Sequence, residues 1–473
     1  ARGRCILKQV DWQPLLAQLA EQYRAHAPAS AALQERGRAV LVDGGSHALR
    51  LIEPFPPRIA AAHGAYVWDE DGHQIVDLWQ GHFANVLGHN PPQITAPVAA
   101  ALADGWGLQT GFTDRGQIEA AEILCRQTGA ERVRFTTSGA LATMYAVLLA
   151  RAYTGRDLVL KVGGGWHGGQ PWGLKGAGFR PGEGFDHADT AGLPAAVDHE
   201  TVLTRFNDPD RLADQFRAIG DRLACFIVEP YIGAGGGIPA TREYLTLARE
   251  LTAAHGVVLI ADEVIAGFRF RAGDLTALYG VQPDLATFGK VIGGGMPVTA
   301  VAGRAEILNL AGRAGGSKVK FSGGTYSGHP AAMLAALTAM TYLAEHEQEV
   351  YPRLALLGAL VRRAAEDAFA AEGIVARCTG SSPELSCGSS LGCLHFPFEA
   401  DHPLLSPEDT LDPAVCDVVL SERVLKLALL LEDVHVEHGL GGLSTGHSAA
   451  DLTRLAEAYG SAARRIKRYL ECG

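Results

Sequence analysis

The sequence predicts an α/β fold in which helices cover a mainly parallel sheet. Between residues 117 and 335, short apolar segments of strand length alternate with longer segments of helical length, a pattern typical of parallel sheets. In addition, two of the apolar segments end close to chemically useful side chains, those of Asp262 and Lys290. Open α/β sheets bind ligands at the carboxyl ends of their strands. The predicted fold therefore places an acid and an amine where a ligand would lie.

The first 60 residues predict a helical segment followed by an extended arm. Residues 11–42 are expected to be helical with a break at Pro28, because apolar side chains recur near helical spacing at Leu15, Leu16, Leu19, Leu33 and Val40. Residues 43–59 are rich in glycine and proline and predict an arm that crosses a surface. After the arm, the pattern around Asp71 and Gly72 predicts a hairpin of two short strands.

The central part of the chain predicts the sheet and its helices. Residues 241–256 form a clear helical pattern. The expected strands are residues 131–137, 157–162, 223–229, 256–262 and 283–289. After Pro330 the composition changes: residues 331–373 predict helix, and the remainder predicts short strands and a closing helix over residues 451–470. We expect three parts: an N-terminal helix and arm (residues 1–60), a large α/β domain (61–335) and a small C-terminal α+β domain (336–473).

Composition excludes several classes of function. The chain has 473 residues, 47% of them hydrophobic and 20% charged, which is ordinary for a soluble enzyme. Its net charge of −11 argues against a nucleic-acid surface, since phosphate binding relies on clustered lysine and arginine. The chain lacks the long apolar run of a membrane span, and its first residues lack the apolar region of a secretion signal. We expect a cytoplasmic protein.

The eight cysteines do not predict a metal site. Cys378, Cys387 and Cys393 lie nearest to one another, but they are not arranged as the CxxC pairs that structural zinc usually requires. We interpret the cysteines as reduced thiols and expect no metal.

Lys290 and Asp262 together predict pyridoxal phosphate chemistry. In such enzymes a lysine forms a Schiff base with the cofactor aldehyde, and an acid keeps the pyridine nitrogen protonated so that the ring withdraws electrons. Each residue alone has an ordinary explanation, because an acid after a strand often caps a helix and a single lysine is usually a surface residue. Their combination, 28 residues apart and each after a buried strand, favours the cofactor.

Other segments supply residues suited to the rest of such a cofactor. Ser138 and Gly139 begin a helix, where free N–H groups attract phosphate, although a serine there can also be a plain N-cap. Trp166 and His167, neighbours in a glycine-rich turn, are both candidates for cofactor binding; the Trp166 ring can stack on the cofactor ring or pack within the loop. Thr325 offers a hydroxyl to a phosphate oxygen, or is an ordinary loop residue.

Two residues near the expected strand ends complete this set. Glu229 ends one strand, where its carboxylate could lie near the phenolic oxygen of the cofactor or cap the turn. Val264 would point to the same side as Asp262 if the strand continued, and could then press on one face of the ring.

These motifs resemble those of the class III aminotransferases of fold type I, nearest to the glutamate-1-semialdehyde aminomutase-like branch. The resemblance runs from about Gly44 to the C-terminus and rests on the Asp-Glu-Val element at Asp262, on Lys290 followed by VIGGGMPV, and on GTYSGHP around Thr325. It implies a homodimer with active sites at the interface.

The resemblance also implies roles for individual residues. Lys290 would be the Schiff-base lysine and Asp262 the partner of the pyridine nitrogen. Ser138 and Gly139, with Ala140 next to them, would form the phosphate cup, and Thr325 would reach the phosphate of the other subunit. Trp166 stands where the family usually has a stacking tyrosine.

The sequence departs from the family pattern at three places. The phosphate motif, usually Ser-Gly-Thr-Glu-Ala, continues here as Ala140-Leu141-Ala142 after Ser138 and Gly139. The loop after His167 lacks the Gly/Ser/Thr-rich pattern that gates the aminomutases, which favours transamination. The arm also differs from the usual one, in which an arginine often binds the substrate carboxylate.

For substrate binding we consider an arm residue first. Arg50 is the first candidate for the carboxylate and His47 the second, although an arm residue can also face solvent. His82 and Trp166 are further candidates for a partly aromatic pocket.

The predicted function is amino-group transfer from an amine or amino acid to a keto acid or aldehyde. A 1,2-amino shift within one molecule or a racemisation remains an alternative, because the Lys–Asp pair is shared by these reactions. A non-catalytic cofactor-binding module is an alternative of another class, but it would have no need of the pair. A nucleotide-dependent dehydrogenase is disfavoured because no GxGxxG follows an early strand.

Overall fold

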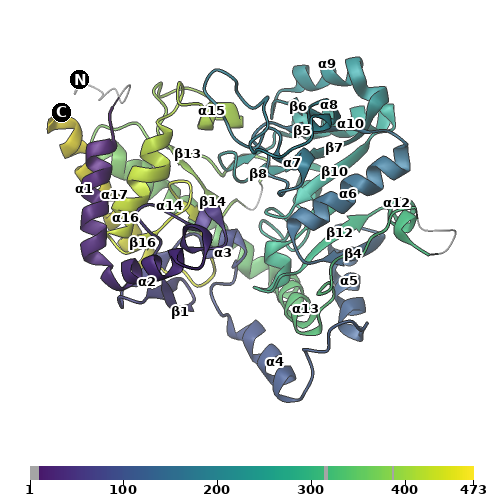
Figure 1. The fold of residues 1–473 in the computed structure, drawn as a ribbon, viewed down its shortest axis with the longest axis horizontal. Coiled ribbons are helices and arrows are strands. Elements are labelled where there is room, and N and C mark those ends of the chain that lie inside the picture. The colour runs from purple at the N-terminus through teal and green to yellow at the C-terminus, as the bar shows by residue number, and fades with distance from the viewer. Residues whose placement is uncertain (1–9, 314–317, 386–387, 473) are drawn as a thin grey trace.

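The computed structural model describes residues 10–313, 318–385 and 388–472. Figure 1 shows a large lobe built around a long sheet and a smaller lobe in which helices from both ends of the chain lie side by side. The smaller lobe contains α1 (Gln13–His26) and α17 (Ala449–Cys472). Cys5 and Cys387 lie outside the described residues, whereas the six cysteines within them are free thiols, as expected.

The large lobe is organised by one seven-stranded sheet with the order β4-β12-β11-β10-β7-β5-β6. Six strands are parallel to one another, and β12 is antiparallel to both of its neighbours. The mainly parallel sheet and the five expected strands are confirmed, whereas two strands were missed, β6 and β12. The strands are β4 (Arg132–Thr136), β5 (Leu158–Val162), β6 (Thr201–Thr204), β7 (Leu223–Val228), β10 (Val258–Glu263), β11 (Leu285–Phe288) and β12 (Thr299–Gly303).

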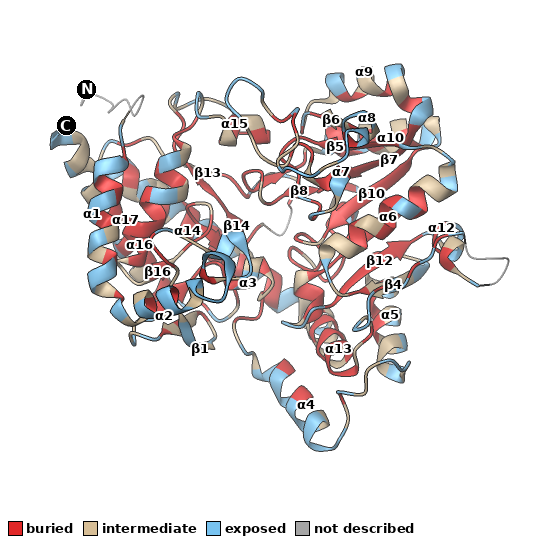
Figure 2. Ribbon diagram, viewed as in Figure 1, coloured by how far each residue is buried: buried red, intermediate tan, exposed pale blue. Residues whose placement is uncertain are grey.

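Helices cover both faces of this sheet because its strands alternate their apolar side chains between the two sides. One face packs on α6 (Gly139–Thr154) through residues such as Val159 and Ile227. The opposite face packs on α9 (Pro209–Ile219) and α10 (Arg242–His255) through Leu160 and Phe226. It also packs on α5 (Arg115–Thr128) and α13 (Pro330–Glu345). In Figure 2 the sheet is almost entirely buried, and the helices expose one side.

The sequence explains where these helices begin and end. Thr241 accepts a hydrogen bond from the backbone N–H of Tyr244 at the start of α10, and Gly256, with a left-handed φ of 62°, ends it. Ser138 and Gly155 have the same roles for α6. The predicted helix over 241–256 is therefore confirmed.

The small lobe combines both ends of the chain. Its core joins Trp12, Leu19 and Tyr23 from the N-terminal segment to α14 (Glu347–Ala371), α16 (Leu425–Leu430) and α17. Trp12 Nε1 donates a buried hydrogen bond to Asp417 Oδ2 at 2.7 Å. The expected break at Pro28 is confirmed, because α2 (Pro28–Arg38) begins there.

The predicted hairpin belongs to this lobe as well. β1 (Ile59–His63), β2 (Tyr66–Asp69) and β3 (Gln74–Asp77) are antiparallel neighbours, and β3 pairs in parallel with β16 (Val434–His435). In contrast, α13 lies against α4 (Pro92–Ala103) and α5 of the large lobe. We therefore propose domain boundaries that differ from those expected from sequence: the hairpin joins the small domain, and the large domain extends through α13.

The remaining elements are short. They are η1 (Val42–Gly44), η2 (Ala48–Arg50), α3 (Gln80–Phe83), α7 (Pro171–Leu174), α8 (Ala196–Glu200), η3 (Gly220–Arg222), β8 (Tyr231–Ile232), β9 (Ile238–Pro239), α11 (Thr276–Tyr279), η4 (Lys290–Gly293), α12 (Ala305–Leu308), η5 (Asn309–Ala311), β13 (Arg377–Cys378), β14 (Leu391–Gly392), β15 (Leu394–His395), α15 (Pro407–Leu411), η6 (Leu420–Val424) and β17 (Gly441–Gly442). Among the described residues, every helix is too short or too polar to span a bilayer.

Two helical glycines allow a test of the small-lobe packing. A Cβ at Gly358 in α14 would lie 2.0 Å from the backbone oxygen of Ser389, whereas at Gly460 in α17 it would meet the mobile end of Arg464 at 3.2 Å. We expect Gly358→Ala to destabilise the protein by about 1–3 kcal/mol through overpacking. Gly460→Ala should be neutral or stabilising by up to about 1 kcal/mol, because alanine favours helix. Denaturant unfolding measures both, and equal effects of the two changes would contradict the packing.

Candidate active site

The predicted site residues lie along one edge of the sheet. Glu229 follows β7, Asp262 is near the end of β10 and Lys290 follows β11, and these three strands are neighbours in that order. His167 follows β5, on the other side of β7. The structure thus brings the acid and the amine to the same edge of the sheet, as the sequence predicts.

Asp262 is buried and held on both oxygens. Its Oδ2 accepts a hydrogen bond from His167 Nδ1 at 2.7 Å, and its Oδ1 accepts from Thr287 Oγ1 at 2.8 Å and from the backbone N–H of Val264 at 3.2 Å. The partners come from three segments, so the carboxylate has a defined orientation. His167 therefore positions Asp262, and its side chain points to this acid.

Glu229 is a second buried carboxylate beside Asp262. Its oxygens accept hydrogen bonds from the backbone N–H groups of Trp166 at 2.9 Å and Gly233 at 3.3 Å. Burial, together with the charge of Asp262, raises the pKa of Glu229 to about 8. Of its two predicted roles, the structure shows the capping one; a contact with the cofactor's phenolic oxygen stays a proposal.

Lys290 combines an unusual backbone with a perturbed amine. Its φ of 48° lies in the left-handed region, which a non-glycine residue seldom adopts outside turns and functional sites. Burial lowers the pKa of Lys290 to about 8, although Glu229 and Asp262 favour its charged form. A substantial share of this amine is therefore neutral just above neutral pH.

The start of α6, which follows β4, offers backbone N–H donors; β4 is two strands from β11, the strand before Lys290. The Ser138 hydroxyl accepts from the backbone N–H of Leu141 at 3.3 Å, so this serine does cap its own helix. The first N–H groups of a helix lack acceptors within it and attract anions. Gly139 also packs closely on Val264, since a Cβ there would lie 3.1 Å from Val264 Cγ1. Val264 itself follows the last residue of β10, so the strand does not continue through it.

The loop after β5 is fastened to α6. Thr143 Oγ1 donates to the His167 carbonyl at 2.5 Å, and Gln170 Nε2 donates to the same carbonyl at 2.6 Å. A Cβ at Gly168 would lie 2.5 Å from the Cα of Ala140, so the small residues at both positions permit this approach. Trp166 remains 47% exposed, and its ring is available for a ligand.

Three of the predicted substrate residues form one group: Arg50 and His47 from the arm, and His82 from α3. Arg50 Nε donates to His82 Nε2 at 3.2 Å, and the ring centroids of His47 and His82 are 4.8 Å apart. Burial and the charges of His47, Lys290 and Arg50 lower the pKa of His82 to about 3, so this ring is neutral. Burial and the charges of Arg50 and Lys290 also lower the pKa of His47. The group therefore lies within electrostatic range of Lys290.

His82 is presented by a turn with left-handed backbone. All four residues of α3 have positive φ, 47° at Gln80, 63° at Gly81, 57° at His82 and 67° at Phe83. Such a run is costly for non-glycine residues. Asp77 anchors it by accepting from the backbone N–H groups of Trp79 and Gln80, both at 2.9 Å.

Thr325 is exposed on a loop beside the start of α6. A Cβ at the neighbouring Gly324 would lie 3.4 Å from Thr137 Oγ1 of the same chain. A contact between Thr325 and the phosphate bound by another subunit would form only in an oligomer, and it stays a proposal.

Sequence reasoning missed three residues that support this site. Lys161 is fully buried in β5, where its Nζ donates to the carbonyls of Gly173 at 3.2 Å and Lys175 at 2.8 Å. Thr287 binds Asp262, and Asp77 holds the turn of His82. A lysine inside the apolar segment Leu158–Val162 was a detectable signal, because lysine is almost never fully buried without a partner. The two others had no such signal in the sequence.

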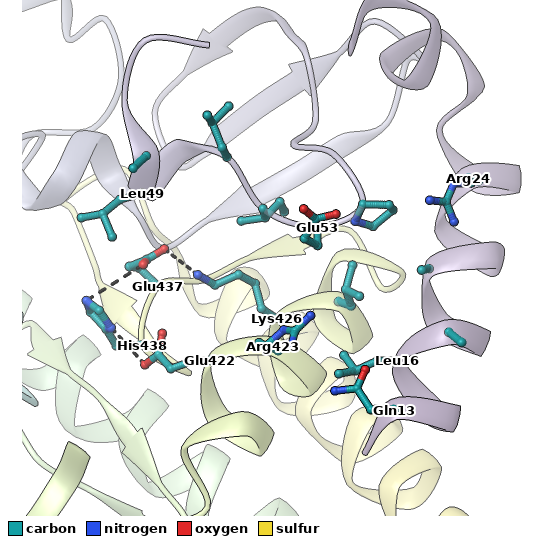
Figure 3. A pocket seen from close by; sticks show the side chains of 17 residues that line it. Gln13, Leu16, Arg24, Leu49, Glu53, Glu422, Arg423, Lys426, Glu437 and His438 are labelled. Atoms are coloured by element: carbon teal, nitrogen blue, oxygen red, sulfur yellow. Dashed lines mark hydrogen bonds and ion pairs between the residues drawn. The ribbon is translucent and has the colours of Figure 1, made fainter. Parts of the chain in front are cut away.

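A separate hollow lies in the small lobe. It has a volume of about 570 Å³ and is lined by α1, the arm around Leu49 and Glu53, and the segment from Glu422 to His438. Figure 3 shows Lys426 pointing to Glu437 and His438 pointing to Glu422. Lys426 Nζ lies 3.0 Å from Glu437 Oε2, and His438 Nδ1 lies 3.0 Å from Glu422 Oε1. The hollow contains none of the residues that surround Lys290 in the site described above.

Comparison with known proteins agrees with this geometry. The family model described as Aminotransferase class-III matches residues 52–368, which is more than half of the chain. The chain belongs to the class III aminotransferases. A similar curated protein is the glutamate-1-semialdehyde 2,1-aminomutase of Methanoculleus marisnigri, 34% identical over 91% of this chain and 99% of that protein.

Solved structures of this class III aminotransferase's relatives have the same fold. An omega-transaminase from Sphaerobacter thermophilus is 33% identical, with a TM-score of 0.83, over 93% of this chain and 98% of that one. A β-phenylalanine aminotransferase from Variovorax paradoxus is 30% identical, with a TM-score of 0.82, over 95% and 97% of the two chains. The recognised family and the fold class predicted from the sequence are thereby confirmed.

Proposed function

We propose that this chain is a pyridoxal phosphate-dependent aminotransferase that moves an amino group from an amine or amino acid to a keto acid or aldehyde. The observation that carries the proposal is the pair formed by Lys290, an amine whose pKa is about 8, and Asp262, a buried carboxylate on the adjacent strand. Membership of the class III aminotransferases supports the same reaction.

The residues present fit the cofactor at each of its polar ends. The N–H groups at the start of α6, near Ser138 and Gly139, would hold a phosphate dianion. The fixed carboxylate of Asp262 would hold a protonated pyridine nitrogen, and the amine of Lys290 would bond to the aldehyde carbon. Trp166 and Val264 would lie against the ring. Pyridoxal phosphate bound there supplies an electron-withdrawing ring, which acidifies the C–H bond beside the substrate's amino group.

Lys290 would then act as the base. A neutral amine accepts a proton, and the lowered pKa of Lys290 makes the neutral form available near physiological pH. In this proposal its Nζ takes the proton from the substrate carbon that carries the amino group. The resulting ammonium would be stabilised by Asp262 and Glu229, whose charges favour the protonated lysine. Lys290 Nζ would then hold this proton and pass it to the carbon of the former cofactor aldehyde, because returning it to the substrate carbon would not complete an amino transfer.

Arg50, His47 and His82 would select the substrate. Arg50 supplies a permanent positive charge, and the neutral ring of His82 beside it leaves that charge free to pair with a carboxylate. The arginine is exposed, so it can rearrange when a substrate binds. We therefore propose a donor or acceptor that carries a carboxylate in addition to the reacting group.

An amino shift within one molecule is the second candidate. The curated relatives that support it are named glutamate-1-semialdehyde 2,1-aminomutase, and the chain matches up to 99% of their length. Such a mutase keeps its intermediate until the shift is complete, whereas an aminotransferase releases a carbonyl product.

We also propose a homodimer with sites shared between subunits. Four large apolar side chains, Leu108, Phe112, Ile118 and Tyr326, are 61–73% exposed. Gln117 joins the two segments that carry them, since its Nε2 donates to the carbonyls of Phe112 at 3.4 Å and Gly328 at 3.1 Å. An exposed apolar patch of this kind is typical of an interface.

The free thiols support a reducing compartment, which we propose to be the cytoplasm.

The reaction is tested by the absorbance spectrum of the cofactor-loaded protein with a panel of amino donors. We expect one class of donor to convert the cofactor to its amino form and to release a stoichiometric carbonyl product. Lys290→Ala should lower turnover by about 10³-fold or more, because it removes the base. Conversion of substrate without a released carbonyl would support the mutase or a racemase instead, and full turnover in Lys290→Ala would refute the role of the lysine.

The substrate proposal is tested with Arg50→Ala. Loss of one charged hydrogen bond costs about 1.5–3 kcal/mol, so KM for a carboxylate donor should rise about 10–100-fold. KM for a simple amine should change little. Arg38→Ala is the matched control, because Arg38 is an exposed arginine of α2 that pairs with Glu35 at 3.0 Å. An equal loss for both kinds of donor in Arg50→Ala would contradict the proposed contact.

The role of Thr325 across the interface is tested by mixing two variants. In a heterodimer of Lys290→Ala and Thr325→Ala chains, one site keeps its lysine and receives an intact Thr325 from the other subunit if the threonine acts between subunits. That site should bind cofactor with wild-type affinity. If Thr325 acts within its own chain, the only site with a lysine lacks the threonine, and the mixture shows the weakened affinity of Thr325→Ala.

A further inference from the structure

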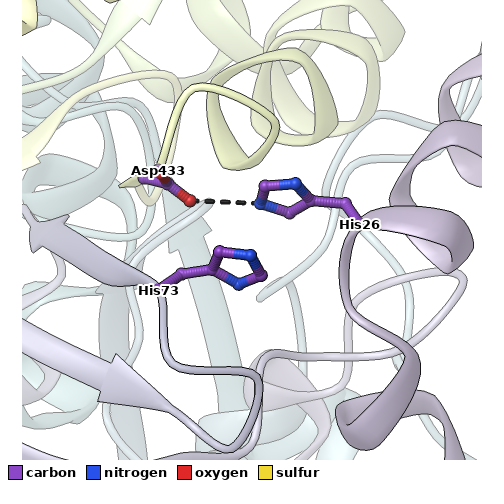
Figure 4. A group of neighbouring side chains, drawn as sticks. All are labelled: His26, His73 and Asp433. Carbon is purple, nitrogen blue, oxygen red and sulfur yellow. Dashed lines mark hydrogen bonds and ion pairs between the residues drawn. The ribbon is translucent and has the colours of Figure 1, made fainter.

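A group of metal-ligating side chains lies in the small lobe, away from the residues around Lys290. His26 ends α1, His73 follows the β2–β3 turn, and Asp433 precedes β16. Figure 4 shows both imidazoles and the carboxylate turned toward one another. One potential ligand atom from each of the three residues lies within 4.8 Å of the others. Three segments distant in sequence thus converge with their donor atoms.

His73 is oriented as a metal-binding histidine is. Its Nδ1 contacts Asp69 Oδ2 at 2.9 Å, and Asp69 is buried. Asp69 Oδ1 accepts from the backbone N–H groups of His73 at 2.8 Å and Asp71 at 3.1 Å, so the acid itself is fixed. A carboxylate that accepts from one ring nitrogen leaves the other with a free lone pair, which is the usual support of a metal-bound histidine.

Asp433 is held in a comparable way. Its backbone oxygen accepts from the N–H of Val76 at 2.9 Å, which fixes the turn before β16. One carboxylate oxygen, Oδ1, contacts His26 Nε2 at 3.1 Å, and the other, Oδ2, lies 3.8 Å from Arg454 Nη2. The arginine occupies the oxygen that faces away from the histidine, so Oδ1 is available as a single ligand.

The distances require a small adjustment. Ligand atoms around tetrahedral zinc, with bonds of about 2.0–2.1 Å, are about 3.3 Å apart. The rings of His26 and His73 are stacked with centroids 3.9 Å apart and planes 10° from parallel, so they must tilt for both nitrogens to face one ion. Both side chains are about three-quarters buried and open to solvent on one side, which permits this rotation.

We infer that His26, His73 and Asp433 bind one divalent transition-metal ion, and that zinc is the occupant. Two imidazoles and one carboxylate form a donor set that zinc accepts and that magnesium and calcium, which prefer oxygen, do not. Water supplies the fourth ligand, since the three side chains are 24–29% exposed. The ion joins the end of α1, the hairpin and β16, and it stabilises the packing of the N-terminal helix on the small lobe.

A second group with metal-ligating side chains is a weaker candidate. Glu422, Glu437 and His438 also lie within reach of one another in the hollow of Figure 3. Lys426 already contacts Glu437 at 3.0 Å, and its charge occupies the position that a cation would need. His438 Nδ1 contacts Glu422 at 3.0 Å.

The test is zinc binding to the cofactor-loaded protein after treatment with a chelator. Equilibrium dialysis with metal analysis should give one zinc per chain, and magnesium should not compete. At a zinc concentration 100-fold above Kd, the unfolding midpoint should rise by about 2–3 °C. His26→Ala and His73→Ala should each weaken binding at least tenfold. Asp69→Asn should weaken it about 10–100-fold, because an amide can donate to Nδ1 and leave the proton on the coordinating nitrogen.

Two variants serve as controls. His346→Ala changes a partly exposed histidine between α13 and α14 that pairs with Glu349 at 3.5 Å, and it should leave zinc binding unchanged. His438→Asn alters the second group, with asparagine chosen because His438 has a φ of 52°. The cofactor absorbance of each variant reports that it is folded. Absence of a stoichiometric site, unchanged affinity in His26→Ala and His73→Ala, or loss of binding in His438→Asn would each overturn the inference.

Discussion

The site depends on two buried carboxylates placed side by side at the ends of β7 and β10. Glu229 and Asp262 repel each other, and burial makes both charges costly. This cost is offset by hydrogen bonds to all four acid oxygens and by two buried amines. Against the effect of burial, the charge of Glu229 raises the pKa of Lys161, and the charges of Glu229 and Asp262 raise the pKa of Lys290. Glu229 responds by a raised pKa. The loop of Trp166, the ring of His167 and the hydroxyl of Thr287 have their positions because these acids need donors.

A second anchor, Asp77, joins the small lobe to this edge. It is buried at the end of β3, where His89 Nε2 and His435 Nδ1 contact its oxygens at 2.7 and 2.9 Å. The two histidines outweigh the effect of burial and lower the pKa of Asp77 well below its usual range. Because this carboxylate also fixes the left-handed turn, the position of His82 beside Lys290 is set by residues from the small lobe. The lobes therefore meet at the group formed by Arg50, His47 and His82.

The sequence was sufficient to predict most strands of the large sheet and the polar residues at the ends of these strands. Apolar segments of strand length predicted β4, β5, β7, β10 and β11, and with them the polar side chains at or just after the strand ends, such as Asp262 and Lys290. β12 was missed because it follows a glycine-rich loop and consists of small residues, and β6 because it is short and partly polar. The domain boundaries that we propose differ from those expected from the sequence because α1 and the hairpin share a core with helices far along the chain, and no local pattern predicts such a contact.

Local sequence patterns also could not predict contacts between site residues that are far apart in the chain. His167 was predicted beside the cofactor from its neighbourhood in the loop, but its hydrogen bond to Asp262 spans 95 positions. Arg50 and His82, 32 positions apart, were proposed separately, and the fold makes them one group. Hydrophobic periodicity predicts strands and helices but not the roles of polar residues. The family resemblance indicated which polar residues belong to the cofactor site.

The reversed strand β12 has a consequence for how Lys290 is held. It separates β4 from β11, and its first residue, Thr299, lies beside Thr136 at the end of β4, with their hydroxyls 2.5 Å apart. β12 also pairs antiparallel with β11, with Phe288 opposite Ala300. The chain from Lys290 to Thr299 therefore stays at this edge of the sheet instead of crossing to its far end, as the connection between two parallel strands would. Sheet hydrogen bonds fasten both ends of this short connection, so side-chain exchange in the pocket can change what the enzyme accepts while the lysine keeps its place.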